Sequence, residues 1–327
     1  MYPLASEASS IGSPVLWLVT IVVLLALLAL DFVITRRPHE VGMREAVGWS
    51  VFYLVLPVLF GLYVWLAHGT QPSVEFATGW VLEKSLSVDN LFVFMLLLSA
   101  FAVPEELRQR VLLYGIVGAL VLRAVFIALG AAILQAGAWA FLVFGLVLLA
   151  TAVKIFRDAL RGDQHQPDIN QMRSVRLLRR LMPVTEDFRG PRMTVLSGGR
   201  RALTPFALVV VAVLVTDVVF AVDSVPAAYG VTSDPYLVFA TNAFALLGLR
   251  ALYFVLQHAL SRLRHLNHGL ALILAFIGVK LGMTWAHRTW PSVPEIPTVL
   301  SLGVVVVTLV VVTLTSMRAN RRERALR

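Results

Sequence analysis

Carboxylate side chains recur at the same spacing in two apolar stretches of this 327-residue sequence, LEKSLSVDNLFVF and TDVVFAVDSVPAA. In each stretch two acids stand six residues apart, and the second is followed at once by an amide or hydroxyl side chain. These residues are Glu83, Asp89 and Asn90 in the first stretch, and Asp217, Asp223 and Ser224 in the second. A charged side chain at the middle of a membrane costs about 2.5–3.5 kcal/mol even on lenient insertion scales. Four acids on matched segments therefore predict a shared polar cavity for a cation.

The oxygen ligands of this predicted cavity favour a hard divalent cation. Carboxylate, amide and hydroxyl oxygens suit magnesium, calcium or manganese(II), whereas zinc, copper and nickel favour imidazole or thiolate ligands. The chain has no cysteine, which excludes disulfides, thiolate metal sites and thiol redox chemistry. Its seven histidines fall at the ends of apolar stretches or between them. The residues alone predict a hard divalent cation and do not choose among the three metals.

The elements that must position these acids are membrane-spanning helices. The sequence is 58% hydrophobic, and stretches of about 20 apolar residues recur along it, each long enough to cross a bilayer as a helix. The formal net charge of +9 is explained by arginines in cytoplasmic connections, so we expect no nucleic-acid partner. No Lys or Arg precedes the first apolar stretch, so we expect a retained span and not a cleaved signal peptide.

Nine spans are expected, with the N-terminus outside and the C-terminus in the cytoplasm. Under this count the arginine-rich first, third, fifth and seventh connections and the arginine-rich tail share one side, and the opposite connections hold only Arg288. Positively charged connections face the cytoplasm. The expected spans are Pro14–Ile34, Ala46–Leu66, Phe76–Phe101, Val111–Ile133, Trp139–Phe156, Leu203–Tyr229, Tyr236–Leu256, Leu270–Trp285 and Ile296–Ser316.

Charged residues inside the spans repeat in one order. Spans three to five carry two acids, then Arg123, then Lys154, and spans six to eight carry two acids, then Arg250, then Lys280. Because three crossings is an odd number, the second copy runs in the opposite direction, which is an inverted repeat typical of secondary transporters with a site near the midplane. We therefore predict an all-α, polytopic fold with one membrane domain. Its parts are residues 14–66 (peripheral spans one and two), 76–156 (first repeat), 157–202 (cytoplasmic loop), 203–285 (second repeat) and 296–316 (peripheral span nine).

A helix break is expected at the site. Six residues turn an ideal helix by about 240°, so the two acids of one stretch do not share a face of an unbroken helix. Pro226 has no N–H and clashes with the carbonyl one turn back, which predicts a break after Asp223. Irregular backbone at membrane depth is tolerated where it lines a cavity or is buried in protein. The first acidic stretch has no proline to interrupt it.

The cationic residues allow a purely structural alternative. Arg123 and Arg250 could neutralise Asp89 and Asp223 as buried pairs, and loss of one partner from such a pair is strongly destabilising. A mixed arrangement is also open, in which the arginines hold two acids while the others take the cation. The remaining cations in the spans, which could pair locally, snorkel to the interface or support the site, are Lys84, Lys154 and Lys280.

The fifth connection contains the segment Ile169–Pro183, in which arginines alternate with apolar residues. This pattern is typical of an amphipathic helix on anionic lipid. The alternative is a solvated loop whose arginines only set the topology.

The two acidic stretches, as EKSLSVDNLFVF and TDVVFAVDSVPA, resemble the TerC/Alx family of integral membrane proteins. The resemblance continues through GIVGALVLRAVF, PVTEDFRG, TNAFALLGLRALYF and GLALILAFIGVK, and covers roughly residues 30 to 285. Members of that family are associated with manganese export, metal homeostasis and tellurite resistance. The resemblance implies that the four acids handle metal in a bacterial cytoplasmic membrane. Many members carry an acid one turn before the Thr-Asp pair of the second stretch, where this chain has Leu214.

The expected function is export of Mn²⁺ by proton-coupled alternating access, with the metal as substrate and no permanently bound cofactor. No hydrolase pattern is present in the sequence, so we do not expect an enzyme. The alternatives are a Ca²⁺ or Mg²⁺ carrier, a proton-coupled carrier of another substrate, or a non-transporting membrane factor that delivers metal to other proteins. Protons and membrane lipids are the other expected partners, and the sequence leaves the oligomeric state open.

Overall fold

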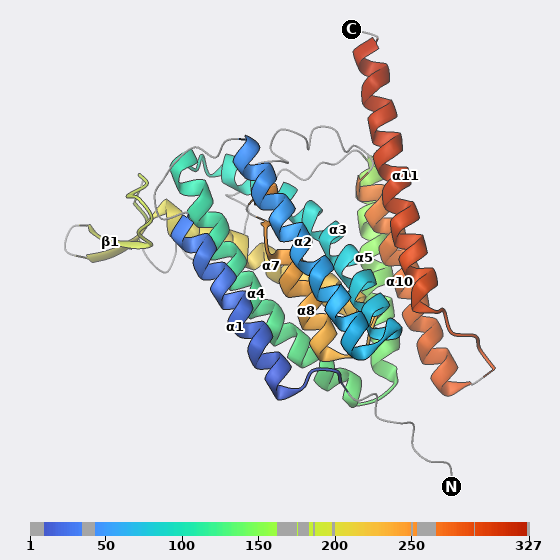
Figure 1. Ribbon diagram of the computed structural model, residues 1–327. Helices are drawn as coiled ribbons and strands as arrows, with labels where there is room; N and C mark the ends of the chain where they lie inside the picture. The colour runs from blue at the N-terminus through green and yellow to red at the C-terminus, as the bar shows by residue number, and fades with distance from the viewer. Residues whose placement is uncertain are drawn as a thin grey trace.

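The computed structural model describes residues 10–34, 43–161, 175, 183–185, 187–197, 200–249, 251–253, 266–290 and 292–325. Within these ranges the fold is helical apart from one two-stranded hairpin. Figure 1 shows the helices gathered into one bundle, with the hairpin beside it. The elements are α1 (Pro14–Ile34), α2 (Met43–His68), α3 (Thr70–Ala100), α4 (Glu105–Gln135), α5 (Trp139–Arg161), β1 (Thr194–Ser197), β2 (Arg200–Leu203), α7 (Pro205–Tyr229), α8 (Pro235–Leu246), α10 (Leu266–Thr289) and α11 (Thr298–Ala325).

The helix boundaries follow the expected spans closely. α1 begins and ends at the expected residues, and α7 ends at the expected Tyr229. Seven of the described helices, α1, α2, α4, α5, α7, α10 and α11, are long and apolar enough to cross a membrane. α3 has 31 residues but includes several charged side chains, and α8 has only 12 residues. The protein is thus a polytopic helical membrane protein, while the count of nine spans stays a prediction.

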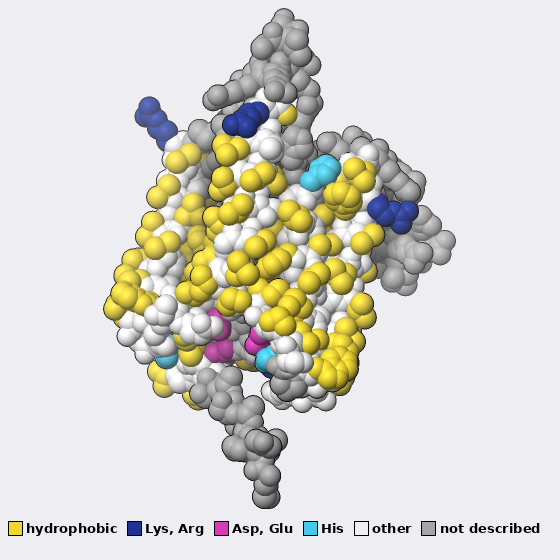
Figure 2. All heavy atoms as spheres, turned by 90° about the vertical axis from the view of Figure 1, so that its right-hand side faces the viewer, with side chains coloured by type: hydrophobic (Ala, Val, Ile, Leu, Met, Phe, Trp, Pro, Cys, Tyr) yellow, Lys and Arg dark blue, Asp and Glu magenta, His cyan; other side chains and the backbone are white. Residues whose placement is uncertain are grey.

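Helix packing brings the two acid-bearing helices to the centre of the bundle. α3 packs against α7, and each also packs against the helix that follows the other, α3 against α8 and α7 against α4. α5 packs along α10, and both α2 and α11 pack against α3. Many large apolar side chains of α1, α2 and α11 are exposed, and Figure 2 shows a broad apolar surface on one face of the molecule. Such a surface suits contact with lipid chains.

α7, which carries Asp217, is continuous. It begins after the N-cap Thr204 and runs as one helix through Pro226 to Tyr229. The predicted break after Asp223 is therefore wrong. Pro226 lies in the last turn, so that its missing N–H removes only one backbone bond just before the helix ends, and neighbouring helices bury this end of α7.

The interruption lies in the seventh expected span, Tyr236–Leu256. α8 ends at Leu246, and the chain turns at Gly248 before helical geometry resumes. Gly248 has a φ of 76°, a left-handed conformation that glycine adopts without steric cost. A Cβ at this position would also collide with Cβ of Tyr53 on α2. The turn therefore requires glycine for its backbone angle and for the close approach of α2.

Lys84 of α3 satisfies the backbone groups that this turn exposes. The last carbonyls of a helix have no partner within the helix. Nζ of Lys84 donates to the carbonyl oxygens of Ala245, at 3.0 Å, and of Leu247, at 3.5 Å. The helix dipole also favours a cation at a C-terminus. Lys84 therefore joins α3 to the end of α8. The alternative that it pairs with a neighbour on its own helix does not apply.

A short antiparallel hairpin precedes α7. In it Thr194 lies opposite Leu203, and Ser197 lies opposite Arg200. The sixth span was expected to begin at Leu203, whereas that residue ends β2 and the helix begins at Pro205. Nearly all of the predicted amphipathic segment Ile169–Pro183 lies outside the described residues.

Candidate functional site

Arg123 of α4 is the centre of a buried ionic cluster, and its side chain is almost fully buried. Its Nη1 contacts the carboxylate of Glu83 on α3, and its Nη2 lies 3.5 Å from Oδ1 of Asp217 on α7. The Nη1 group also donates to Oδ1 of Asn242 on α8 over 2.7 Å. In the amide orientation that satisfies both ends of Asn90, Oδ1 of Asn90 accepts from Nη2 of Arg123 over 3.2 Å. One guanidinium thus joins α3, α4, α7 and α8.

Helical spacing explains which predicted residues lie on the face of the cluster. Glu83 and Asn90 are seven residues apart on α3, which is close to two full turns. Asp217 and Ser224 have the same spacing on α7, and they are 1% and 2% exposed. Asp223 is rotated by about 240° from Asp217 and is only half-buried. On each helix the face toward Arg123 therefore carries the first acid of the stretch and the amide or hydroxyl residue that follows the second acid.

The structure brings together the first acids of the two stretches, Glu83 and Asp217. Asp223 lies on another face of α7 and has interactions of its own. The side chain of Asp89 and the whole of Arg250 lie outside the described residues. A single site made by all four acids accordingly stays a prediction.

Several buried oxygens on α3 and α7 have no hydrogen-bond partner among the described residues. Buried polar atoms without partners are rare in folded proteins, and they are typical of positions that bind an ion or water. Carboxylate and hydroxyl oxygens are also the ligand types that hard divalent cations prefer. The atoms are Oε2 of Glu83, Oδ2 of Asp217, Oγ of Ser87 and Oγ of Ser224.

The charges of the cluster do not cancel. Among the described side chains, the two carboxylates of Glu83 and Asp217 face the guanidinium of Arg123, which leaves this group of three with one net negative charge where it is shielded from solvent. An uncompensated charge in such surroundings attracts a cation strongly. The described residues contain no group of three or more His, Asp or Glu side chains that could hold a metal by themselves. A metal here would therefore need serine or amide oxygens, or acids outside the described part, in addition to the pair.

Sequence reasoning missed Asn242 and Ser87. Asn242 is 1% exposed, and its Nδ2 donates to the carbonyl of Val238 over 3.0 Å while its Oδ1 accepts from Arg123. The signal for Asn242 was a lone amide inside the apolar segment TNAFALLGLR. Ser87 follows Glu83 by one helical turn, and this spacing was the available signal for its position.

The two other predicted lysines differ in exposure. Lys154 is exposed on α5, as expected for a side chain that snorkels toward an interface. Lys280 of α10 is 5% exposed and lines a polar cavity apart from the Arg123 cluster.

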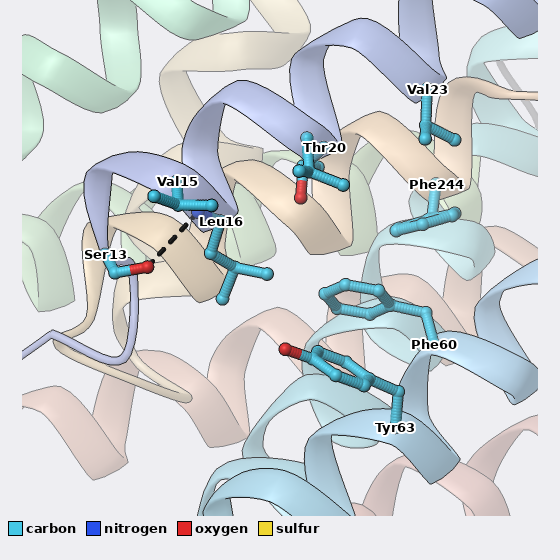
Figure 3. Close-up of a pocket in the computed structure, with 9 residues that line it drawn as sticks. Ser13, Val15, Leu16, Thr20, Val23, Phe60, Tyr63 and Phe244 are labelled. Carbon is cyan, nitrogen blue, oxygen red and sulfur yellow. Dashed lines mark hydrogen bonds between the residues drawn. The ribbon is translucent and has the colours of Figure 1, made fainter.

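A separate pocket between α1, α2 and α8 is mainly apolar. Figure 3 shows Phe60 and Tyr63 of α2 and Phe244 of α8 facing α1 across this space. None of the predicted site residues lines it. Its surface suits a hydrocarbon chain better than an ion.

The spanning helices and the buried ionic cluster define the class of this molecule, which is a polytopic membrane protein with an ionisable site inside the bundle. Such sites in membrane proteins are usually functional. The chain belongs to the TerC family of integral membrane proteins, whose family model matches residues 68–324. This match confirms the resemblance read from the two acidic stretches.

Relatives of the chain are found in several bacteria. A membrane protein of Myxococcus xanthus that is described as uncharacterized is 41% identical over 275 residues, covering 84% of this chain and 85% of the relative. Alx of Escherichia coli strain K12, whose name describes a membrane-bound redox modulator, is 37% identical over 324 residues, covering 96% and 98%. An uncharacterized membrane protein of Mycobacterium tuberculosis is 39% identical over 321 residues, covering 95% and 81%. No solved structure matches the chain.

Proposed function

We propose that the protein is a secondary transporter, rather than an enzyme, that exports Mn²⁺ or a similar hard divalent cation from the cytoplasm. The observation that carries the proposal is the meeting of Glu83 and Asp217, from two separate acidic stretches, at the buried Arg123. Each carboxylate keeps an oxygen without a hydrogen-bond partner among the described residues. The oxygens support a hard divalent cation, and the family resemblance supplies manganese.

In this proposal Arg123 is the resting counter-ion of the two acids, and the metal binds to their unpaired oxygens. The net negative charge of the cluster attracts the cation, and the neutral oxygens around it replace part of the water that the cation loses. The proposed ligands besides Glu83 and Asp217 are Asp89, Asn90 and Ser224, with Ser87 added because of its unpaired buried hydroxyl. The predicted ligand Asp223 lies on another face of α7 and is left out of this set.

An inverted repeat would supply the alternating access. If α3, α4 and α5 correspond to α7, α8 and α10, then the packing of α3 on α8 is the counterpart of the packing of α7 on α4. The contacts of α3 with α7, of α4 with α8 and of α5 with α10 each join a helix to its own counterpart. This pattern supports the proposed repeat. The turn at Gly248 has no counterpart in α4, which is continuous, so the two halves are not identical.

Export from a cell with a negative interior requires an energy source. Moving a divalent cation outward costs about 4.6 kcal/mol per 100 mV, which is twice the cost for a single charge. The simplest source is inward movement of protons that occupy the same carboxylates. We propose the cytoplasmic membrane of a bacterium as the location, with the arginine-rich connections in the cytoplasm; the bacterial relatives support a bacterial membrane.

Metal movement across sealed vesicles that contain the purified protein tests the proposal. Vesicles with Mn²⁺ on the cytoplasmic side should transport it across the membrane, and a proton gradient of the opposite direction should accelerate the movement. Excess Mg²⁺ or Ca²⁺ should inhibit weakly. If Mg²⁺ or Ca²⁺ inhibited Mn²⁺ movement strongly, the result would favour a carrier of the inhibiting ion instead.

The proposal of a metal-delivery factor makes the opposite prediction for the vesicles. It expects no flux and a stoichiometric partner that co-purifies with the protein.

The redox role in the name of the Alx relatives cannot act through a thiol of this chain, because the chain has no cysteine. Metal transport would give such a protein an indirect route to redox effects, since Mn²⁺ is itself redox-active.

A further inference from the structure

A second polar cavity lies at one end of the bundle, and its volume is about 390 Å³. It is lined by the start of α3, the end of α7, the C-terminal part of α10 and the segment that leads into α11. On the face shown in Figure 2, acidic side chains gather near the lower end of a largely apolar surface. All these helix ends belong to the connections that have few arginines, so under the proposed orientation the cavity opens to the outside.

Two carboxylates of this cavity are held in place by neighbouring donors. Glu75 accepts hydrogen bonds from Nε2 of Gln71, at 2.8 Å, and from Oγ1 of Thr232, at 2.6 Å. Glu295 accepts from Oγ1 of Thr284 over 3.5 Å. A carboxylate can accept about four hydrogen bonds. Both side chains therefore keep lone pairs for a ligand in the cavity.

The third charged group of the lining is Lys280, which is 5% exposed. Its ammonium shares this cavity with the carboxylates of Glu75 and Glu295. No described residue forms a hydrogen bond or an ion pair with it, however. Burying an ammonium without a direct partner is costly. The described lining of the cavity thus contains two carboxylates and one ammonium, with one net negative charge.

The cavity and the Arg123 cluster are connected by the same two helices. Glu75 precedes Glu83 on α3 by eight residues, which corresponds to about 12 Å along the helix axis. Tyr229, which lines the cavity, ends the helix that carries Asp217. Of the two carboxylates that line the cavity, that of Glu75 is on the same helix as Glu83 of the cluster.

We propose that this cavity is a second, weaker site for the divalent cation, built from Glu75 and Glu295 at the exit end of the transporter. Lys280 is a tethered competitor for the same carboxylates. The inference rests on the proposed function. Because the ammonium and a divalent metal repel each other strongly in a confined site, the metal binds loosely there and is released outward. When the metal has left, the ammonium again neutralises one of the two carboxylate charges and opposes re-entry.

A binding measurement tests the site without reference to transport. The full chain, purified in detergent, is titrated with Mn²⁺, and free Mn²⁺ is followed by its electron paramagnetic resonance signal. Lys280→Met should strengthen one binding event by about ten-fold or more, because the competing charge is gone. Glu295→Gln should abolish the same event, and it lies in an exposed connecting segment where it is not expected to affect folding. Glu106→Gln, at an exposed acid of α4, should leave all binding unchanged.

Two results would overturn the inference. One is Mn²⁺ binding to Lys280→Met that is no tighter than to the unaltered protein. The other is binding of glycine, used as a zwitterionic probe, to the unaltered protein but to neither Lys280→Met nor Glu295→Gln. The cavity would then be a site for a zwitterion. The transport proposal fails separately. Absence of Mn²⁺ flux with intact binding at the cavity would count against the exporter, whereas intact flux with no binding at Glu295 would count against this site alone.

Discussion

Nζ of Lys84 on α3 donates a hydrogen bond to the carbonyl oxygen of Ala245, 3.0 Å away, at the end of α8. This contact couples the helix of Glu83 to the end of α8, where the seventh expected span is interrupted. Glu83 and Lys84 are consecutive, so the two neighbours face different partners: the acid contacts Arg123 and the lysine binds the broken helix. A movement of α8 would therefore be transmitted directly to the ionic cluster.

Replacing Lys84 with methionine should destabilise the protein. The substitution leaves the carbonyl of Ala245 without its donor, which costs about 1–3 kcal/mol for a buried group. The thermal unfolding midpoint in detergent should fall. Lys154→Met, the same change at an exposed lysine of α5, should leave the midpoint nearly unchanged. Equal midpoints for the two variants would show that Lys84 does not hold the end of α8.

Gly248→Ala should also destabilise the protein. The left-handed backbone at this residue costs a side-chain-bearing amino acid about 1–2 kcal/mol, and the new methyl group would meet Tyr53. Gly282→Ala on α10 is the matched control, because a Cβ there meets nothing within 4 Å. Circular dichroism melting curves of both variants measure the difference. A Gly248→Ala protein as stable as the control would contradict the described turn.

Arg123→Met should be more harmful to stability than Asp217→Asn. Without the guanidinium, Glu83 and Asp217 remain as buried carboxylates without a counter-ion among the described residues, and breaking a buried pair in this way costs about 3–5 kcal/mol. In Asp217→Asn, Arg123 keeps its contact with Glu83. Unfolding of both variants in increasing denaturant gives the order directly. The reverse order would mean that Arg123 is not the residue that holds the acids.

Leu214→Glu tests the position at which this chain departs from many members of the family. Leu214 lies one turn before Asp217 and packs closely on Gly118 of α4. A carboxylate there would add negative charge beside the cluster, and cation sites tighten as charged ligands are added. The affinity for Mn²⁺ in the titration described above should rise. Unchanged affinity in a folded variant would place the cation away from Asp217.

The strongest signals in the sequence concerned membrane insertion and buried charge. Stretches of apolar residues defined α1 at its observed bounds, and the acids of the two matched stretches include both carboxylates of the Arg123 cluster. These signals are strong because a helix needs about 20 apolar residues to cross the hydrocarbon layer. Charged side chains are costly in that layer, and those that occur there are usually functional.

The partners of the charged side chains could not be predicted from the sequence in the same way. A pair between Arg123 and Asp89 was one alternative that the sequence left open; among the described side chains Arg123 contacts Glu83 and Asp217, and the side chain of Asp89 lies outside them. Spacing along one helix gives the relative rotation of its residues but not the helix that each face meets. Pro226 signalled a break, but its cost is small one turn from a helix end. The turn at Gly248 depends on a backbone angle and on contact with α2, and neither is encoded in the local apolar pattern.

Transport by the Asp217→Asn variant is the most direct test of the central claim that the acids at Arg123 carry the metal. Mn²⁺ flux would be measured in vesicles with the unaltered protein, with Asp217→Asn and with Asp187→Asn, a control at an exposed aspartate outside the membrane helices. The account predicts flux that falls by about ten-fold or more in Asp217→Asn, because a charged ligand is lost, and that is unchanged in Asp187→Asn. Asp217→Asn protein that is folded and moves Mn²⁺ at the unaltered rate would contradict it.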